Sequence, residues 1–522
     1  MANEHESNVH EHNGRRPEEH WGARNSLKRN ASLRSKKGTS DENTPLLGSG
    51  GSSGRENGSD ENGSVTALEW DGLAEFQGLP WWRTPSVNWL LPAFFLLALA
   101  VGGILVPKLN LIKSLVCREY FMEQSALQPH LIFTPVLLGD DNPQCEIPDV
   151  QKLVTKFVLY MTIIPGALSA IVSPKLGALS DQYGRNKLLV ITSLGGFLGE
   201  IVLILTATYP DTVKYQWILA GTVLDGICGS FTTGMALTHA YAADCTAPPK
   251  RNVAFGYFHA CLFSGVAFGP FLAALMLRNG GHLITIFYVA LGVHAFFMLF
   301  IALVAPESLS KKRQMLAREK HAAETFEASM AWGAFTEDAS LGQTTLLWLR
   351  SANILAPLKI LWPTGPGTSN TLRANLILLA AIDTIIFGVA MGALTVVVYY
   401  LGFQFHWKTE QTSEFMSLVN IVKVSALITI LPTLNYLVRT RRANRQRRES
   451  GFAIPEPNSG SDNLDLYTVR FAILFEIIGF GGYALARSGS MFVAAGMFAA
   501  IGGVGSPTLQ SALTKHVPHD RV

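Results

Sequence analysis

We single out four charged side chains that lie inside long apolar stretches of the sequence. They are Asp225, Asp383, Lys423 and Glu476. A charge at the centre of a membrane helix costs about 2.5–3.5 kcal/mol on insertion scales, so it normally faces protein or water and marks a pathway. Desolvation favours the neutral form of a carboxylic acid, which makes Asp225 and Asp383 candidates for binding and releasing a proton. For Lys423 and Glu476, a structural ion pair is the alternative.

Two other polar residues lie in the same kind of stretch. Glu200 is near one end of its apolar run, and we interpret it as an interfacial residue. His294 is isolated in its run, so a packed histidine is a simpler interpretation than a proton relay.

A second group of candidate functional residues, made up of glycines and charged side chains, lies in the short gap between two apolar runs. The gap reads Gly177-Ala-Leu-Ser-Asp181-Gln-Tyr-Gly184-Arg185-Asn-Lys187. Asp181 is placed to cap the following helix or to bind the positive end of a helix elsewhere. Arg185 is placed to pair with Asp244, which would close one end of a passage. The alternative is that these charges only keep the loop in the cytosol.

The overall composition is that of a membrane protein. The chain has 522 residues, of which 48% are hydrophobic and only 16% are charged, and its mean hydropathy is +0.24. A net charge of +3 gives no reason to expect nucleic-acid binding. Apolar runs of about 20 residues are long enough to span a bilayer. We predict ten such helices, at 88–108, 153–174, 188–208, 216–236, 254–276, 283–305, 374–399, 414–437, 466–487 and 490–512.

Basic residues indicate the orientation of these helices, because segments rich in lysine and arginine stay in the cytosol. They cluster before the first run, between the second and third, between the fourth and fifth, after the sixth and after the eighth. All five clusters share one side if the N-terminus is cytosolic. The residues are Arg15, Arg16, Lys28, Arg29, Arg185, Lys187, Lys250, Arg251, Lys311, Lys312, Arg313, Arg439, Arg441, Arg442, Arg445, Arg447 and Arg448.

The apolar runs divide the chain into four parts. Residues 1–85 are polar and without hydrophobic period, so we predict a disordered cytosolic tail. Residues 86–308 form a lobe of six helices, and 374–522 a second lobe of four. The segment 309–373 is expected to be a cytosolic linker with a surface helix near 311–331.

The tail contains one short motif. Glu42-Asn-Thr-Pro-Leu46-Leu47 fits an acidic dileucine sorting signal that a sorting adaptor would recognise, although such a short match also arises by chance.

Two of the five cysteines, Cys117 and Cys145, share the long segment between the first two runs. If that segment faces an oxidising compartment they are candidates for a disulfide. Two free thiols are the alternative, because spacing alone does not establish pairing.

Six helices, a linker and a second group of helices resemble the major facilitator superfamily, whose two lobes rock around a central site. The resemblance covers roughly residues 85–522. The gap described above is similar to the family signature Gly-x-Leu-Ala-Asp-Arg-x-Gly-Arg-Lys, although Gln182 and Asn186 replace basic residues. The matching positions are Gly177, Leu179, Asp181, Gly184 and Arg185.

Two further stretches resemble the tetracycline-efflux branch of this family, including fungal members. His239-Ala-Tyr-Ala-Ala-Asp244-Cys-Thr is similar to the Ala-Tyr-x-Ala-Asp-x-Thr motif. Gly265-Val-Ala-Phe-Gly269-Pro270 resembles the first half of the antiporter motif, and its glycines permit close helix approach. The usual terminal Gly-Gly of this motif is Ala273-Ala274 here. The helix-four arginine of the family aligns near Thr222, which counts against a standard proton antiport mechanism.

The resemblance also implies where the membrane carboxylates lie and how long the second lobe is. The first, fourth, seventh and tenth helices of the family line the cavity, which places Asp225 and Asp383 near substrate. Ser506-Pro507 and the following residues resemble the exit from helix ten, after which the family has two more helices. We therefore expect an incomplete second lobe, with a ten-helix protein as the alternative.

The expected fold is an all-α polytopic membrane protein, and the expected function is secondary transport of a small molecule by alternating access with proton coupling. The sequence contains no Walker loop, no metal-spaced His/Cys set and no enzyme constellation, so no cofactor, metal or catalysis is expected. The expected partners are the substrate, protons and the lipid bilayer of a vacuolar or plasma membrane. The alternatives are a membrane sensor without net transport and an inactive truncated product.

Overall fold

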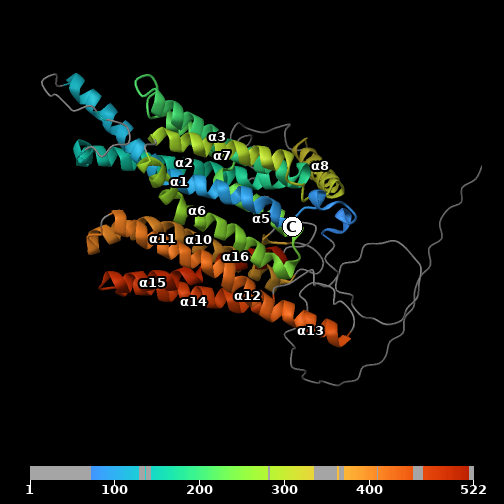
Figure 1. Cartoon of the computed structure of the whole chain (residues 1–522). Helices are drawn as coiled ribbons and strands as arrows, with labels where there is room; N and C mark the ends of the chain where they lie inside the picture. Colours follow the sequence, from blue (N-terminus) through green and yellow to red (C-terminus); the bar gives the residue numbers. More distant parts are fainter. Residues whose placement is uncertain are drawn as a thin grey trace, which may run out of the picture. The chain divides into compact units, whose positions relative to one another are not determined.

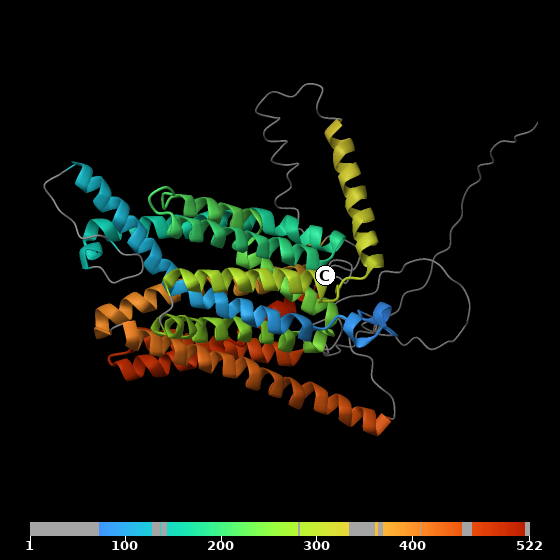
Figure 2. The same ribbon diagram turned by 45° about the horizontal axis from the view of Figure 1, so that its top comes forward.

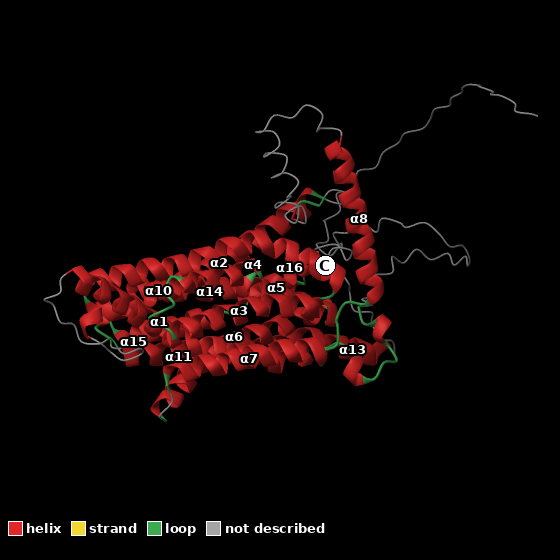
Figure 3. Cartoon of the chain, turned by 90° about the horizontal axis from the view of Figure 1, so that it is seen from above, coloured by secondary structure: helices red, strands yellow, loops and turns green. Residues whose placement is uncertain are grey.

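The computed structural model describes residues 72–127, 136, 143–279, 282–333, 361–363, 369–407, 409–450 and 462–516. All regular secondary structure in these residues is helical (Figure 1; Figure 3). Ten segments of the described residues are long and apolar enough to cross a membrane. The ten predicted helices are therefore confirmed in number and approximate position.

The first six spans comprise seven helices, because the fourth span is interrupted. Short 3-10 turns are η1 (Ala74–Phe76), η2 (Trp81–Arg83), η3 (Pro143–Glu146) and η4 (Pro248–Lys250). The spans are α1 (Val87–Leu127), α2 (Pro148–Tyr183), α3 (Arg185–Thr208), α4 (Trp217–Ile227) with α5 (Ser230–Cys245), α6 (Arg251–Arg278) and α7 (Leu283–Leu303).

The last four spans follow the linker helix α8 (Lys311–Gly333). The eighth span is continuous but contains two π-helical segments, η6 and η7. The elements are α10 (Asn370–Phe405), α11 (Thr409–Ser425), η6 (Ala426–Ile430), α12 (Leu431–Asn435), η7 (Tyr436–Thr440), α13 (Arg441–Ser450), α14 (Asn463–Leu485), α15 (Gly489–Gly502) and α16 (Gly505–His516).

The described residues before α1 contain short helical turns that the prediction did not include. We expected disorder up to residue 85, but η1 and η2 lie between residues 72 and 85. Trp81 stacks on Trp89 of α1 with ring centroids 5.8 Å apart, which gives this segment a fixed contact on the first span.

The first helix is longer than predicted. The prediction ends it at residue 108, yet α1 continues through Pro107 and Lys108 to Leu127. Beyond these residues, Leu111 and Leu115 are buried in the same apolar core as Phe287 of α7. Packing therefore continues the helix through the proline, which neighbouring helices allow in membrane proteins.

The predicted loop at 177–187 is mostly helical. Gly177, Leu179 and Asp181 lie in the last turns of α2, and Gly184 alone separates α2 from α3. Gly184 has φ +101°, which favours glycine, and a Cβ there would lie 2.5 Å from a Glu307 carboxylate oxygen.

The first and fifth spans, α1 and α6, lie side by side with their backbones in contact (Figure 1). A Cβ on Gly265 would lie 2.1 Å from the Ala98 carbonyl oxygen, and one on Gly269 would lie 2.4 Å from the Gly103 nitrogen. Pro270 follows within α6. Small residues permit this approach because a side chain would separate the two helices.

Candidate functional site

Two spans are interrupted at corresponding places in the two halves of the chain. The fourth span breaks at Cys228–Gly229, where Gly229 has φ +94° and Ser230 has φ +55°. The tenth span breaks between α15 and α16, at Gly503–Val504. Interrupted helices in corresponding positions of two repeats are typical of transporter binding sites, because irregular backbone in a membrane must line a cavity.

Each break is contacted by one of the predicted membrane carboxylates. The Ser230 hydroxyl donates to Asp225 Oδ2 at 2.7 Å, so this hydrogen bond bridges the break in the fourth span. In the second half, the Ser506 hydroxyl donates to Asp383 Oδ1 at 3.0 Å, and the Gln510 amide donates to Oδ2 at 3.3 Å. These bonds join α10 to the start of α16.

Lys423 and Glu476 reach the break in the tenth span as well. A Cβ on Gly503 would lie 2.3 Å from Lys423 Cε, and one on Gly502 would lie 2.6 Å from Glu476 Cγ. The two glycines thus leave room for these side chains. The Lys423 ammonium lies 4.0 Å from the centroid of the Phe263 ring on α6, a cation–π contact between the two halves of the chain.

A cavity of about 280 Å³ lies within the first six spans, between α1, α3, α4, α5 and α7. Most of its lining is apolar or carries hydroxyl groups. Among the described residues, its titratable lining residues are Lys108, Glu200, Asp225 and His294.

Two of these residues correct the sequence interpretation. The side chain of Glu200 is 8% exposed rather than interfacial, and its Oε2 lies 3.1 Å from His294 Nδ1. His294 is therefore paired rather than isolated. Lys108 was overlooked because the first helix was predicted to end there; the continuing apolar pattern at 111–116 was the available signal.

Arg185 forms the centre of an ion-pair cluster at the end of the first lobe where α2 ends and α3 begins. Its Nε lies 3.1 Å from Asp244 Oδ2, and its Nη1 lies 2.6 Å from Asp181 Oδ1. The Ser308 hydroxyl also donates to Asp244, at 3.0 Å. The side chains of Arg185 and Asp244 are 4% and 7% exposed. The predicted pairing of these two residues is present in the structure.

The cap of α3 is Glu307, not Asp181. The Glu307 carboxylate accepts backbone N–H groups from Arg185 at 2.8 Å and Asn186 at 3.1 Å, whereas Asp181 points to the Arg185 side chain. A carboxylate at this position stabilises a helix N-terminus. Burial raises the pKa of Glu307, and the backbone donors partly offset this rise.

The linker helix α8, drawn in yellow outside the bundle of spans in Figure 2, contacts the end of α2. Arg318 donates to the Gln182 carbonyl oxygen at 2.8 Å, at the end of α2, and its guanidinium lies 5.0 Å from the Tyr183 ring centroid. The linker is thus joined to the signature segment, a contact that the sequence did not indicate.

A corresponding cluster lies in the second half, with its charges inverted. Asp465 at the start of α14 lies between Arg439 Nη2, at 2.7 Å, and Lys515 Nζ. Asp181, Arg185 and Asp244 occupy the matching ends of the second, third and fourth spans. Arg439 also donates to the Pro249 carbonyl and the Asn252 side chain, which ties the two halves together. We had assigned Arg439 only to orientation.

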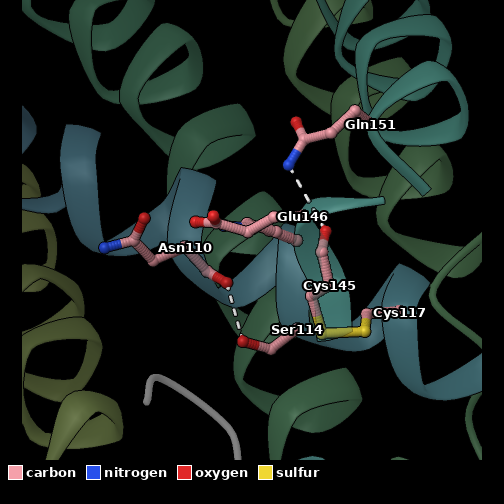
Figure 4. The surroundings of a disulfide bond; sticks show 7 residues. Asn110, Ser114, Cys117, Cys145, Glu146 and Gln151 are labelled. Carbon is pink, nitrogen blue, oxygen red and sulfur yellow. Dashed lines mark hydrogen bonds and ion pairs between the residues drawn. A yellow bond between two sulfur atoms is a disulfide. The ribbon is translucent and has the colours of Figure 1, made fainter. Parts of the chain in front are cut away.

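Cys117 and Cys145 form a disulfide in the structure (Figure 4). It joins α1 to η3. The disulfide and the Arg185 cluster lie at opposite ends of the first lobe. Gln151 donates to the Cys145 carbonyl at 3.3 Å, which links this segment to α2. The sorting signal at Glu42, Leu46 and Leu47 lies outside the described residues.

The family model for the Major Facilitator Superfamily matches residues 154–455. This chain belongs to that superfamily of membrane transporters, as the sequence resemblance predicted. A human organic anion transporter, MFSD10 (TETRAN), has the same fold, with a TM-score of 0.53 and 15% identity over 84% of this chain and 88% of that one.

The sequence is also similar to those of curated fungal and bacterial transporters. The MFS-type transporter avaJ of Aspergillus versicolor is 29% identical over 92% of this chain and 83% of its own length. The efflux pump ustT of Aspergillus flavus is 22% identical over 66% of this chain and 62% of its length. The class C tetracycline resistance protein of Escherichia coli is 36% identical over 105 residues, which are 20% of this chain and 24% of that protein.

Proposed function

We propose that this protein is a secondary active transporter that exports a small organic molecule by alternating access, coupled to protons. The observation that carries the proposal is the pair of interrupted spans, each with a carboxylate at its break. A carboxylate in the membrane interior changes charge when it binds a proton. Because Asp225 and Asp383 each bond across or onto a break, protonation of either changes the hydrogen bonding of a helix that lines the pathway.

The two ion-pair clusters support alternating access. Both lie at the same ends of their lobes, and Arg439 joins the lobes there by its contact with Pro249. We assign this end to the cytosol, because the basic segments at Lys250–Arg251 and Lys311–Arg313 lie there. In this arrangement the clusters hold the cytosolic end closed, and lobe rocking requires them to open.

The direction and the class of substrate rest on the relatives. A named efflux pump and a tetracycline resistance protein are among them, so we propose efflux of a small organic compound from the cytosol. Glu42, Leu46 and Leu47 are proposed to direct the protein, through a sorting adaptor, to a vacuolar membrane, where the same direction loads the vacuole.

Asp225→Asn and Asp383→Asn are each expected to abolish proton-driven transport, because asparagine has no negative charge at the break that can bind a proton or respond to one bound nearby. The measurement is flux in proteoliposomes with and without a pH gradient, with tetracycline as the first probe and a library of small organic compounds thereafter. Asp149→Asn, on the exposed first turn of α2, is the matched control and keeps the wild-type response. Gradient-driven flux that survives in both site variants contradicts this assignment.

A further inference from the structure

We propose that the cavity inside the first six spans is a one-proton site, in which His294 and Glu200 share the proton while Lys108 and Asp225 set the charge balance. The inference rests on the proposed proton coupling and adds the place where the proton resides.

The imidazole of His294 lies between two carboxylates. Its Nδ1 is 3.1 Å from Glu200 Oε2 and 3.3 Å from the carbonyl oxygen of Ala290, one turn earlier in α7. Its other nitrogen lies toward Gly196, where an added Cβ would be 3.2 Å from His294 Nε2 and 3.8 Å from Asp225 Oδ1. The absence of a side chain at Gly196 therefore leaves open the space beside which His294 Nε2 and Asp225 Oδ1 both lie.

The charges of the cavity leave room for one proton. With neutral His294, one ammonium group and two carboxylates give a net charge of −1 (+1 − 2), and a proton on His294 makes the cavity neutral. Lys108 lines the same cavity as Asp225 and Glu200, and its single positive charge offsets only one of these two carboxylates. An uncompensated charge is costly in a site removed from water, which favours uptake of the proton.

The neighbouring elements contribute no further charge to the cavity. The helices that pack against α7 are α1, α3 and α6, which place Lys108, Glu200 and the apolar Leu262 in the lining. Cys228, which borders Gly195 beside Asp225, is not part of the cavity lining.

The site is connected to the break in the fourth span through Asp225. Its Oδ2 accepts from Ser230 across the break, and its Oδ1 is on the side of His294. An imidazolium at His294 attracts this carboxylate and competes with the Ser230 hydroxyl. Proton occupancy thereby biases the geometry of a helix that lines the pathway, which is what coupling requires.

The test is a pH titration of protein labelled with ¹⁵N-histidine in lipid nanodiscs, in which the His294 signal is identified by its loss in His294→Gln. The wild-type signal is expected to titrate in a single step. Glu200→Gln removes a neighbouring negative charge and is expected to lower the proton affinity at least tenfold. Lys108→Met is expected to raise the proton affinity of His294, because the cavity loses its positive charge. Combining Lys108→Met with Asp225→Asn is expected to restore the wild-type affinity, because the net charge returns to −1.

Controls separate this charge effect from a loss of folding. Glu123→Gln, an exposed carboxylate on the same α1 as Lys108, leaves the titration unchanged, and the exposed His282 is an internal reference. If Glu200→Gln does not fold, Asp225→Asn alone is the substitute test, because it also removes a negative charge and is also expected to lower the proton affinity of His294. A His294 signal that does not titrate between pH 4 and 10, or an equal midpoint in the charge variants, overturns the site.

The two proposals fail in different ways. If His294 titrates as expected but no pH gradient drives flux in proteoliposomes, the site stands and the proposed function is wrong. If His294→Gln keeps gradient-driven flux with the wild-type pH dependence, transport stands and the site is wrong.

Discussion

Asp465→Asn is expected to cause the largest loss of stability of any single substitution proposed for this protein. The Asp465 side chain is fully buried and faces Arg439 and Lys515, whose side chains are 11% and 1% exposed. Removing the carboxylate leaves two cations in a buried site without their shared partner. Breaking a buried ion pair costs about 3–5 kcal/mol, and this site loses two contacts at once.

Thermal unfolding of the purified protein, followed by intrinsic fluorescence, measures this effect. Asp462→Asn is the matched control, because Asp462 also pairs with Arg439, at 2.8 Å, but is 43% exposed. An exposed pair contributes about 0–1 kcal/mol, so this control shifts the midpoint little. Lys515→Met in the Asp465→Asn background recovers part of the loss. Equal midpoints for Asp465→Asn and Asp462→Asn contradict the role of this cluster.

Arg185→Met is expected to have the second largest effect. It leaves Asp244 buried without its cation and removes the partner of Asp181, at a cost of about 3–5 kcal/mol. It also removes a contact that holds α3 to α5 at the end proposed to close. We therefore expect both a lower unfolding midpoint and greater accessibility of that end to a thiol reagent.

Reactivity of a cysteine introduced at Ser308, which bonds to Asp244, reports the accessibility. Lys187→Met is the control, since Lys187 is exposed and lies in the same signature segment. Arg185→Met combined with Asp244→Leu is expected to regain stability without regaining closure, because both members of the buried pair are removed together and no ion pair forms between them. Unchanged reactivity in Arg185→Met contradicts the gate.

The number and place of the spans could be predicted from the sequence because a lipid-facing helix must be apolar along its length. The helix breaks could not. Gly229 and Gly503 are two of many glycines in these spans, and glycine is common in unbroken membrane helices as well. What distinguishes them is a hydrogen bond from Ser230 or Ser506 to a carboxylate, and the second of these joins helices distant in sequence.

The charge clusters also contain some contacts that could be predicted from the sequence and some that could not. Arg185 and Asp244 lie in recognisable motifs at the ends of adjacent spans, so their pairing could be predicted. Glu307 caps α3 from a position 122 residues later than Arg185, and no local pattern encodes that contact. Lys108 was missed because helix length is set by packing rather than by composition. The role of a single charge in an apolar run depends on the partners that the fold brings to it, so the sequence alone does not predict that role.

In the proposed function, protons drive this protein between two states that are open at opposite ends. Distances between spin labels in nanodiscs test it directly, without knowledge of the substrate. One pair is placed at Tyr183 and Arg445, at the end that carries the Arg185 cluster, and the other at Tyr209 and Met491, at the opposite end. All four positions are exposed. We expect that lowering the pH from 8 to 5 shifts the distance distributions of the two label pairs in opposite directions. Asp225→Asn is expected to suppress this shift. Distributions that stay the same across this range at both ends contradict it.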